Sequence, residues 1–434
     1  MTAAEPTLDR RVARHILERM GAAGVPPSAG LSAINVGNQS LLNVLQTEYF
    51  DDLLTYGSTF KLVQAHYGGG KTHFLRLIRD LAWQRDFAVA LVELSPNECP
   101  YDDPVRVYTA VATQLAARPA DPLREADTGL PQVLRRAALQ LMEQATDGAD
   151  SRNEREKARA SILRELRHAS CESPSFRAAV VQYVDAVLSD DSHRQGLLTA
   201  WMMGEAVPLS DVSPLGVHES LGKANGFKML RSLTQMLHAV GYTGTALLFD
   251  EVDRTLSVSN RRIQVIGDNL RQVIDLCGGN RMPNTLFVYA VPPEFMRSVV
   301  PNYPALQQRI ASPIPLSHRN PQGVVINLEE LDLEPQAFLE ALGAKLVTVV
   351  EVARGVTFSR ANQAANASRL ARMCVSREFD VNHRRLFVKA WLQWLQAQLL
   401  DGERVATDDD LAPLVQAGAA VAEPDELADA FEDF

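Results

Sequence analysis

Four short and almost uninterrupted apolar runs are spread along the chain, at residues 60–64, 87–94, 246–249 and 284–295. Runs of this length without polar alternation are typical of parallel strands that are covered on both faces. The segments between them place apolar residues at helical spacing. The pattern therefore predicts an α/β fold in which helices flank a parallel sheet.

Helical periodicity also predicts where the helices lie. The expected segments are 73–83, 102–120, 133–148, 151–170, 226–244, 261–277, a short helix within 302–317, and 382–400. The polar, helix-rich stretch at 96–215 is much longer than a plain crossover between two strands, which usually needs little more than one helix. We therefore expect a helical insertion at about 96–215.

A glycine-rich turn joins the first predicted strand to the helix at 73–83. The turn reads Ala-His-Tyr-Gly-Gly-Gly-Lys-Thr, from Ala65 to Thr72. A strand, such a turn and a helix N-terminus direct backbone N–H groups and the positive end of a helix dipole at one point, which suits a polyphosphate. Lys71 would reach the β- and γ-phosphates of ATP, and the Thr72 hydroxyl would ligate Mg²⁺. The alternative is a flexible turn before an exposed lysine, which the flanking elements disfavour.

The glycines of this turn would allow positive φ angles and a close approach of the backbone to the phosphates. Ala65 takes the place of the first glycine of the usual pattern. The candidate nucleotide-binding residues of the turn are Ala65, Tyr67, Gly68, Gly69, Gly70, Lys71, Thr72 and His73.

A second motif follows the apolar run at 246–249, where Asp250 and Glu251 end the predicted strand. Carboxylates at the C-terminal end of a parallel strand lie where α/β sheets bind ligands. Asp250 would hold Mg²⁺, directly or through water, and Glu251 would orient the attacking water. An acidic helix start after a buried strand is the alternative reading of this pair alone, and the glycine-rich turn disfavours it.

Composition agrees with an intracellular enzyme that has a substantial core. The chain has 434 residues, of which 46% are hydrophobic, and its four cysteines are widely spaced. Such spacing suggests reduced thiols and no zinc site. The N-terminus lacks an apolar signal region, and no uninterrupted apolar span of about 20 residues is present. We expect a cytoplasmic protein without a membrane anchor.

Charge is concentrated at the C-terminus. Residues 401–434 contain eleven acidic residues and one basic residue, which accounts for the formal net charge of −10 of the whole chain. A segment of this kind usually stays solvated, so we expect an acidic, disordered tail. The alternative is an arm that docks on a basic partner through Phe431 and Phe434. Because the remaining chain is neutral, charge does not support DNA binding, although DNA stays possible.

Arginines beyond the fourth predicted strand are candidate phosphate contacts. Arg309 lies in the short helix within 302–317, where a ring-forming ATPase would project an arginine into the site of the neighbouring subunit. Arg384 and Arg385 begin the helix at 382–400, where a cation is unfavourable and therefore suggests a function. A surface role is the alternative for each. A polar sensor of the γ-phosphate is expected near the fourth strand, where Tyr289 and Asn284 are weak candidates.

Taken together, these motifs resemble those of the ATP-binding proteins of BREX bacteriophage-exclusion systems, and in particular the BrxD-type proteins of the phage-growth-limitation form. The resemblance covers most of residues 30–400. It is carried by the segments 34–42, 60–80, 92–104, 246–253, 287–295 and 303–310.

The resemblance implies a P-loop NTPase of the AAA+/ASCE type with an ORC-like fold. Its parallel sheet would have five strands in the order 5-1-4-3-2, followed by a helical C-terminal lid. The family's Val-Gly-Arg motif near the adenine corresponds to Val36, Gly37 and Asn38. The Asn-Pro-Arg start of its lid helix corresponds to residues 382–384, which favours Arg384 over Arg385 as the phosphate contact. It also implies partners among other defence proteins, namely helicase, methyltransferase or phosphatase-like components, and a homo-oligomer or hetero-complex.

The sequence thus divides into an N-terminal helical segment with part of the nucleotide site (1–58), a P-loop ATPase core (59–330), a helical lid (331–400) and the acidic tail (401–434). We expect an ATP-hydrolysing, Mg²⁺-dependent protein that serves antiphage defence as a motor or switch, with Glu251, Lys71 and Arg309 as catalytic residues. The alternative is a slow nucleotide-gated loading or recruitment module, like initiator and transposition-regulator ATPases.

Overall fold

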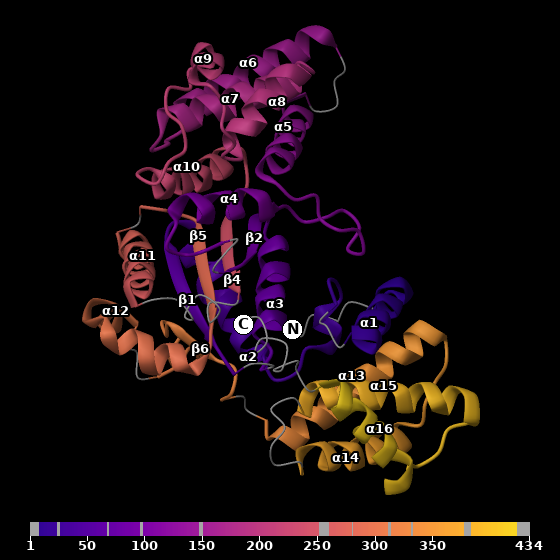
Figure 1. The fold of residues 1–434 in the computed structure, drawn as a ribbon. Coiled ribbons are helices and arrows are strands. Elements are labelled where there is room, and N and C mark those ends of the chain that lie inside the picture. The colour runs from indigo at the N-terminus through magenta and orange to yellow at the C-terminus, as the bar shows by residue number, and fades with distance from the viewer. Residues whose placement is uncertain are drawn as a thin grey trace, which may run out of the picture.

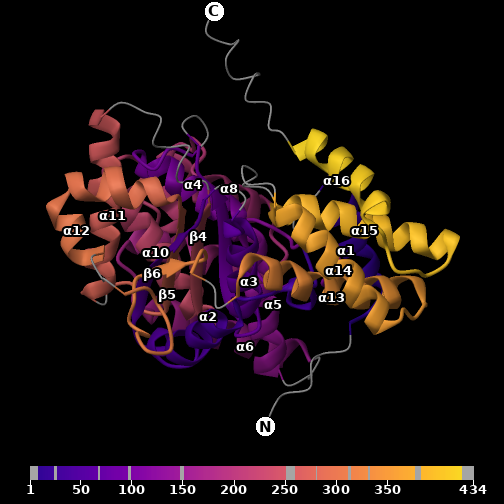
Figure 2. The same cartoon turned by 90° about the horizontal axis from the view of Figure 1, so that it is seen from below.

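The computed structural model describes residues 8–23, 27–66, 69–95, 99–146, 151–250, 260–279, 281–310, 314–330, 333–376 and 383–422. At its centre, helices cover both faces of a six-stranded sheet (Figure 1). Helices α5 to α9 extend from one end of the sheet, and α1 gathers with α13 to α16 in a separate group (Figures 1 and 2). No helix among the described residues is long and apolar enough to cross a membrane.

The sheet is built mainly from the apolar runs. Its strands are β1 (Ser58–Gln64), β2 (Phe87–Glu93), β3 (Leu115–Ala116), β4 (Gly244–Asp250), β5 (Thr285–Val291) and β6 (Val325–Asn327), in the order β3-β2-β4-β5-β1-β6. β4 and β5 are buried at every position, which explains why their sequences are continuously apolar. The mixed α/β architecture is compatible with a P-loop NTPase.

The sheet differs in detail from the expected five parallel strands. β1, β2, β4, β5 and β6 are parallel, and numbered along the chain they lie in the order 5-1-4-3-2 from β6 to β2. The sixth strand, β3, is antiparallel to β2 and pairs with Val89 and Ala90. It forms because the chain leaves α4 in an extended conformation at Leu115, which allows two residues to cover the exposed edge of β2.

The two faces of the sheet have separate cores. One face packs against α3 (Lys71–Trp83), α2 (Gln39–Val44) and the π-helix η2 (Leu45–Phe50). The other face packs against α4 (Pro104–Gln114), α10 (Gly226–Ala239), α11 (Asn260–Gly278) and α12 (Pro304–Ile310). Because side chains alternate along a strand, a residue's position in β2 or β4 decides which of these cores it faces.

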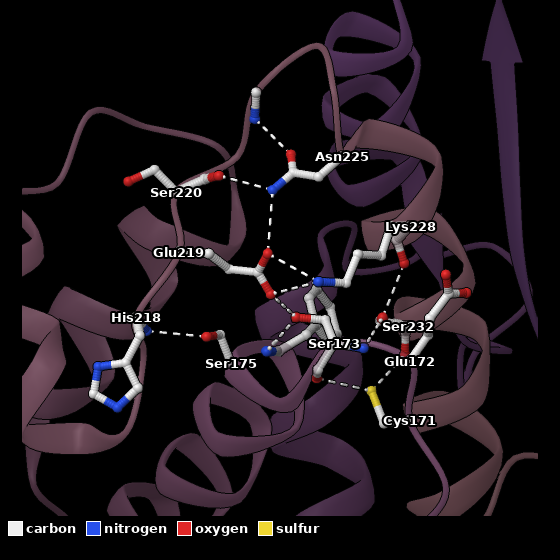
Figure 3. Close-up of polar contacts among 12 residues, drawn as sticks. Cys171, Glu172, Ser173, Ser175, His218, Glu219, Ser220, Asn225, Lys228 and Ser232 are labelled. Carbon is white, nitrogen blue, oxygen red and sulfur yellow. Dashed lines mark hydrogen bonds and ion pairs between the residues drawn. The ribbon is translucent and has the colours of Figure 1, made fainter.

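A polar cluster fastens the helices of the insertion to α10 (Figure 3). These helices are α5 (Leu130–Thr146), α6 (Arg152–His168), α7 (Pro174–Leu188), α8 (Ser192–Met202) and α9 (Leu209–Val212). Lys228 of α10 donates to both carboxylate oxygens of Glu219 at 3.0 Å, and Ser173, which caps α7, donates to Glu219 at 2.5 Å. Burial alone would raise the pKa of Glu219, but these hydrogen bonds outweigh it and the pKa is lowered.

The C-terminal helical group is α13 (Pro335–Arg354), α14 (Arg360–Val375), α15 (His383–Asp401) and α16 (Asp408–Ala422), and α1 (Arg10–Ala23) packs into the same core. Arg10 and Arg14 of α1 donate to the carbonyl oxygen of Ala353 at 3.3 and 3.4 Å. Cations are favourable at that place because it is the C-terminal end of α13. Trp391 and Trp394 are buried in this core, 0% and 4% exposed, as expected for core residues.

Part of the expected disordered tail is helical, which corrects the sequence-based expectation. Asp408, Asp409 and Asp410 form the first turn of α16, where negative charge is favourable next to the positive end of the helix dipole. Leu411 and Val415 follow at helical spacing and are buried in the C-terminal core, at 0% and 2% exposure. The many acidic residues of this segment hide the apolar stripe when only charge is counted. Residues 423–434, with Phe431 and Phe434, lie outside the described residues.

Lys61, in the middle of β1, is buried and makes no ion pair with a carboxylate among the described residues. Its side chain is 1% exposed, and its ammonium donates to the Tyr49 hydroxyl at 2.5 Å and to the carbonyl oxygen of Gly323 at 2.7 Å. Burial lowers the pKa of Lys61 from 10.5 to about 7. Burial and the neighbouring Glu48 raise the pKa of Tyr49 to about 12, so this hydroxyl stays protonated and neutral.

Replacing Lys61 should remove a pH-dependent loss of stability. Between pH 7 and 10.5 the unfolded chain binds a proton at Lys61 that the folded chain has released, so wild-type stability should rise with pH in this window. Two pH units in this window correspond to about 2 to 3 kcal/mol. We expect Lys61→Met to have a higher thermal unfolding midpoint than the wild type at pH 7, and a smaller rise from pH 7 to pH 9. Lys157→Met, at an exposed position of α6, is the control. Equal slopes in wild type and Lys61→Met would contradict this account.

Candidate nucleotide site

The glycine-rich turn lies between the end of β1 at Gln64 and the start of α3 at Lys71. Gly70 immediately precedes the helix with a φ angle of 95°, which a residue with a Cβ rarely adopts. A Cβ on Gly69 would lie 2.7 Å from the Cβ of Ala65 and 3.0 Å from the carbonyl oxygen of His66. The turn is therefore too tight for a side chain at position 69, where the Cβ of Ala65 lies opposite. Tyr67 and Gly68 lie outside the described residues.

Lys71 points back over the turn. It is 9% exposed, and its ammonium donates to the carbonyl oxygens of Ala65 at 2.9 Å and His66 at 3.1 Å. These carbonyls hold the positive charge of Lys71 at the turn. The arrangement concentrates positive charge where the backbone and the start of α3 already favour an anion.

Thr72 and Asp250 are brought together by the fold, although 178 positions separate them in the sequence. The Thr72 hydroxyl donates to the Asp250 carboxylate at 2.6 Å. Asp250 ends β4 and is 4% exposed, so its carboxylate is held at the C-terminal edge of the sheet next to the start of α3. The two motifs found in the sequence therefore form one site.

The oxygen atoms of Thr72 and Asp250 fit a divalent cation such as Mg²⁺. Mg²⁺ usually binds one or two protein oxygens and fills its remaining positions with water and phosphate oxygens. Two hard donors beside a phosphate-binding turn match that requirement. Among the described residues no group of three or more His, Cys, Asp or Glu could hold a metal ion, so a complete protein cage is not the arrangement found there.

The family comparison agrees with this geometry. Residues 8–401 match the family model described as BREX system ATP-binding protein BrxC/D. The chain belongs to this family. A comparison with curated proteins gives no match.

In this BrxC/D family member, the C-terminal helices contact the glycine-rich turn directly. Arg384, at the start of α15, donates from Nη1 to the carbonyl oxygen of Gly69 at 2.8 Å. Its guanidinium carbon also lies 4.5 Å from the centroid of the Phe338 ring in α13. Burial lowers the pKa of Arg384, and the nearby Glu329 opposes that effect. An arginine distant in sequence is thus placed at the glycine-rich turn.

Burial and the nearby positive charges together set the protonation state of His73. Burial, followed by Arg76 and Arg384, lowers the pKa of His73 to about 4. The imidazole is therefore neutral at pH 7 and does not add to the positive charge that Lys71 and Arg384 bring to this end of α3.

Sequence reasoning missed two carboxylates that contact His66 of the turn. Glu329, just after β6, accepts the backbone N–H of His66 at 2.8 Å, and the His66 ring lies 3.5 Å from Glu329 and 4.0 Å from Glu294. Glu294 follows β5. The signal available in the sequence was their position after a strand, but β6 has only three residues and was not predicted as a separate element.

The segment expected near the adenine connects α3 to the C-terminal helices. Leu31 packs with α3, whereas Ile34 and Val36 are buried in the core of the C-terminal helices. Gly37 has a φ angle of 77°. Asn38 is 8% exposed, and among the described residues no group donates a hydrogen bond to its side-chain oxygen.

The two candidate sensors of the γ-phosphate, Tyr289 and Asn284, are not brought to this site. The hydroxyl of Tyr289 is fully buried against the hydroxyl of Tyr101 at 2.5 Å, on the face of the sheet opposite α3. Asn284 precedes β5 and donates to the carbonyls of Leu54 and Thr55. Neither therefore stands at the C-terminal ends of the strands. Glu251 and residue 382 lie outside the described residues, and of Arg309 only the backbone position in α12 is described.

Proposed function

We propose that the chain is an AAA+-like, BrxD-type ATPase that hydrolyses ATP in a BREX or phage-growth-limitation defence system and acts as a motor or switch for partner proteins. The hydrogen bond between Thr72 and Asp250 carries the proposal, because it joins the phosphate-binding turn to the acidic strand end in one site. Family membership supports nucleotide binding independently.

Each residue has a defined role in the proposal. Lys71 and the backbone of the turn bind the β- and γ-phosphates of the substrate, and Thr72 and Asp250 hold Mg²⁺. The bound Mg²⁺ would neutralise charge that develops on the phosphate oxygens. Glu251 orients the attacking water, Arg384 contacts phosphate from the same subunit, and Arg309 reaches the site of a neighbouring subunit.

Val36, Gly37 and Asn38 would form the adenine side of the site. The side-chain oxygen of Asn38 is buried and accepts no hydrogen bond from the described residues.

The test is phosphate release by the purified chain as a function of protein concentration, with wild type and Arg309→Ala side by side. We expect Mg²⁺-dependent turnover per subunit that rises with concentration and is lost in Arg309→Ala, because the neighbouring subunit completes the site. Tight ATP binding with negligible turnover at every concentration, with and without duplex DNA, would instead favour a nucleotide-gated loading or recruitment module.

A further inference from the structure

A third carboxylate stands at the same edge of the sheet as Thr72 and Asp250. Glu93 is the last residue of β2, and in the parallel pairing of β2 with β4 it lies directly opposite Asp250. The pairing continues past it, since Leu94 donates its N–H to the carbonyl oxygen of Asp250 at 3.0 Å. Neighbouring strands lie about 4.8 Å apart, so the backbones of Glu93 and Asp250 are adjacent.

The side chains of Glu93 and Asp250 point to the same face of the sheet. Along β2, Phe87 and Val89 belong to the core beneath α3, and along β4, Ala246 and Leu248 do so as well. Alternation at a period of two carries this face to Glu93 in β2 and to Asp250 in β4. It is the face on which Thr72 meets Asp250. Glu93 is the one exposed position of β2, so its carboxylate stands in solvent beside that contact.

Electrostatics places Glu93 and Asp250 around one arginine. Burial, followed by Arg79 and Arg19, lowers the pKa of Arg76 in α3, and both Asp250 and Glu93 oppose this effect. Arg76 lies one turn of α3 beyond Thr72, so its positive charge lies near both carboxylates. The Asp250 carboxylate accepts a hydrogen bond from Thr72. The Glu93 carboxylate makes no hydrogen bond or ion pair with the part of the chain that is described.

We propose that Glu93 is a second catalytic carboxylate, which accepts the proton that the attacking water releases at the γ-phosphate. The inference rests on the proposed ATPase function and adds to it a residue on the strand next to Asp250. The water oxygen forms a bond to the γ-phosphorus while the bond from that phosphorus to the β–γ bridging oxygen breaks. ADP leaves with the electron pair of that bond, and the proton lost by the water passes to the Glu93 carboxylate and then to solvent.

The test compares Glu93→Gln, Glu93→Asp and the wild type in the full chain, with Glu205→Gln at an exposed site after α8 as the matched control. Phosphate release gives turnover, and calorimetry gives the affinity for Mg-ATP. Glu93→Gln should lose at least about tenfold in turnover, the lower end for a positioned proton acceptor. Its affinity for Mg-ATP should be unchanged or severalfold higher, because a negative charge near the polyphosphate is removed. Glu93→Asp should recover part of the turnover, and Glu205→Gln should match the wild type in both measurements.

Separate results would overturn the two proposals. A wild-type chain that binds Mg-ATP but releases no phosphate under any condition would overturn the ATPase function and the role of Glu93 with it. An active wild type with Glu93→Gln within twofold of its turnover would overturn the role of Glu93 alone. A parallel loss of turnover, Mg-ATP affinity and thermal unfolding midpoint would assign Glu93 a structural role and would likewise overturn the proposal.

Discussion

Replacing Lys71 by alanine should abolish binding of Mg-ATP, with a loss of affinity of more than about a hundredfold. Its ammonium lies over the phosphate-binding turn and is held there by the carbonyls of Ala65 and His66. A hydrogen bond to a charged group contributes about 1.5 to 3 kcal/mol, and Lys71 would make more than one such bond to the two terminal phosphates. Calorimetric titration with Mg-ATP measures the loss directly, and turnover should fall with it.

Lys71→Ala should leave the fold intact, because the Lys71 side chain contacts the turn and not the core beneath it. Its thermal unfolding midpoint should therefore stay close to that of the wild type. Lys157→Ala, on the exposed face of α6, provides the control for removing one positive charge. Unchanged Mg-ATP affinity in a folded Lys71→Ala chain would remove the main support for the site.

The proximity of the glycine-rich turn to the acidic strand end was largely predictable from the sequence because both are local patterns. The turn from Ala65 to Thr72 and the strand ending at Asp250 each place their chemistry within a few residues of a strand end. Parallel strands then bring those ends together, which accounts for the contact between Thr72 and Asp250. The position of Arg384 at the turn, by contrast, was suggested by the family resemblance together with its unfavourable place at a helix start.

Features that depend on tertiary packing were not predicted. The short strands β3 and β6 carry too few residues for a hydrophobic period, and the buried positions of α16 are hidden within an acidic composition. The apolar run at 60–64 does not reveal that Lys61 is buried with its ammonium on the Tyr49 hydroxyl. Tyr289 stands in the expected strand, but its side chain faces Tyr101 on the far face of the sheet. The alternation of residues along a strand does not reveal which face of the sheet lies toward the proposed nucleotide site.

Arg384→Ala should reduce ATP turnover by about 10- to 100-fold, because a charge-assisted hydrogen bond of about 1.5 to 3 kcal/mol is lost at the phosphates. Arg384 is partly buried, lies against the Phe338 ring and donates to the carbonyl of Gly69, so its guanidinium is already held at the turn. Arg384→Lys should recover only part of the turnover, because an ammonium lacks the planar fork that binds two oxygens at once. Turnover and Mg-ATP affinity of the three proteins are the measurements.

The neighbouring Arg385 supplies the matched control, since it carries the same charge one position along α15 and its side chain is exposed. A charge effect on the C-terminal helices as a whole would change Arg384→Ala and Arg385→Ala alike. A specific contact with phosphate predicts that only Arg384→Ala loses turnover, and that its thermal unfolding midpoint falls little because the α13–α15 core stays intact. The reverse result, with Arg385→Ala impaired and Arg384→Ala normal, would reassign the phosphate contact. In that case the hydrogen bond from Arg384 to the carbonyl oxygen of Gly69 would only hold α15 against the turn.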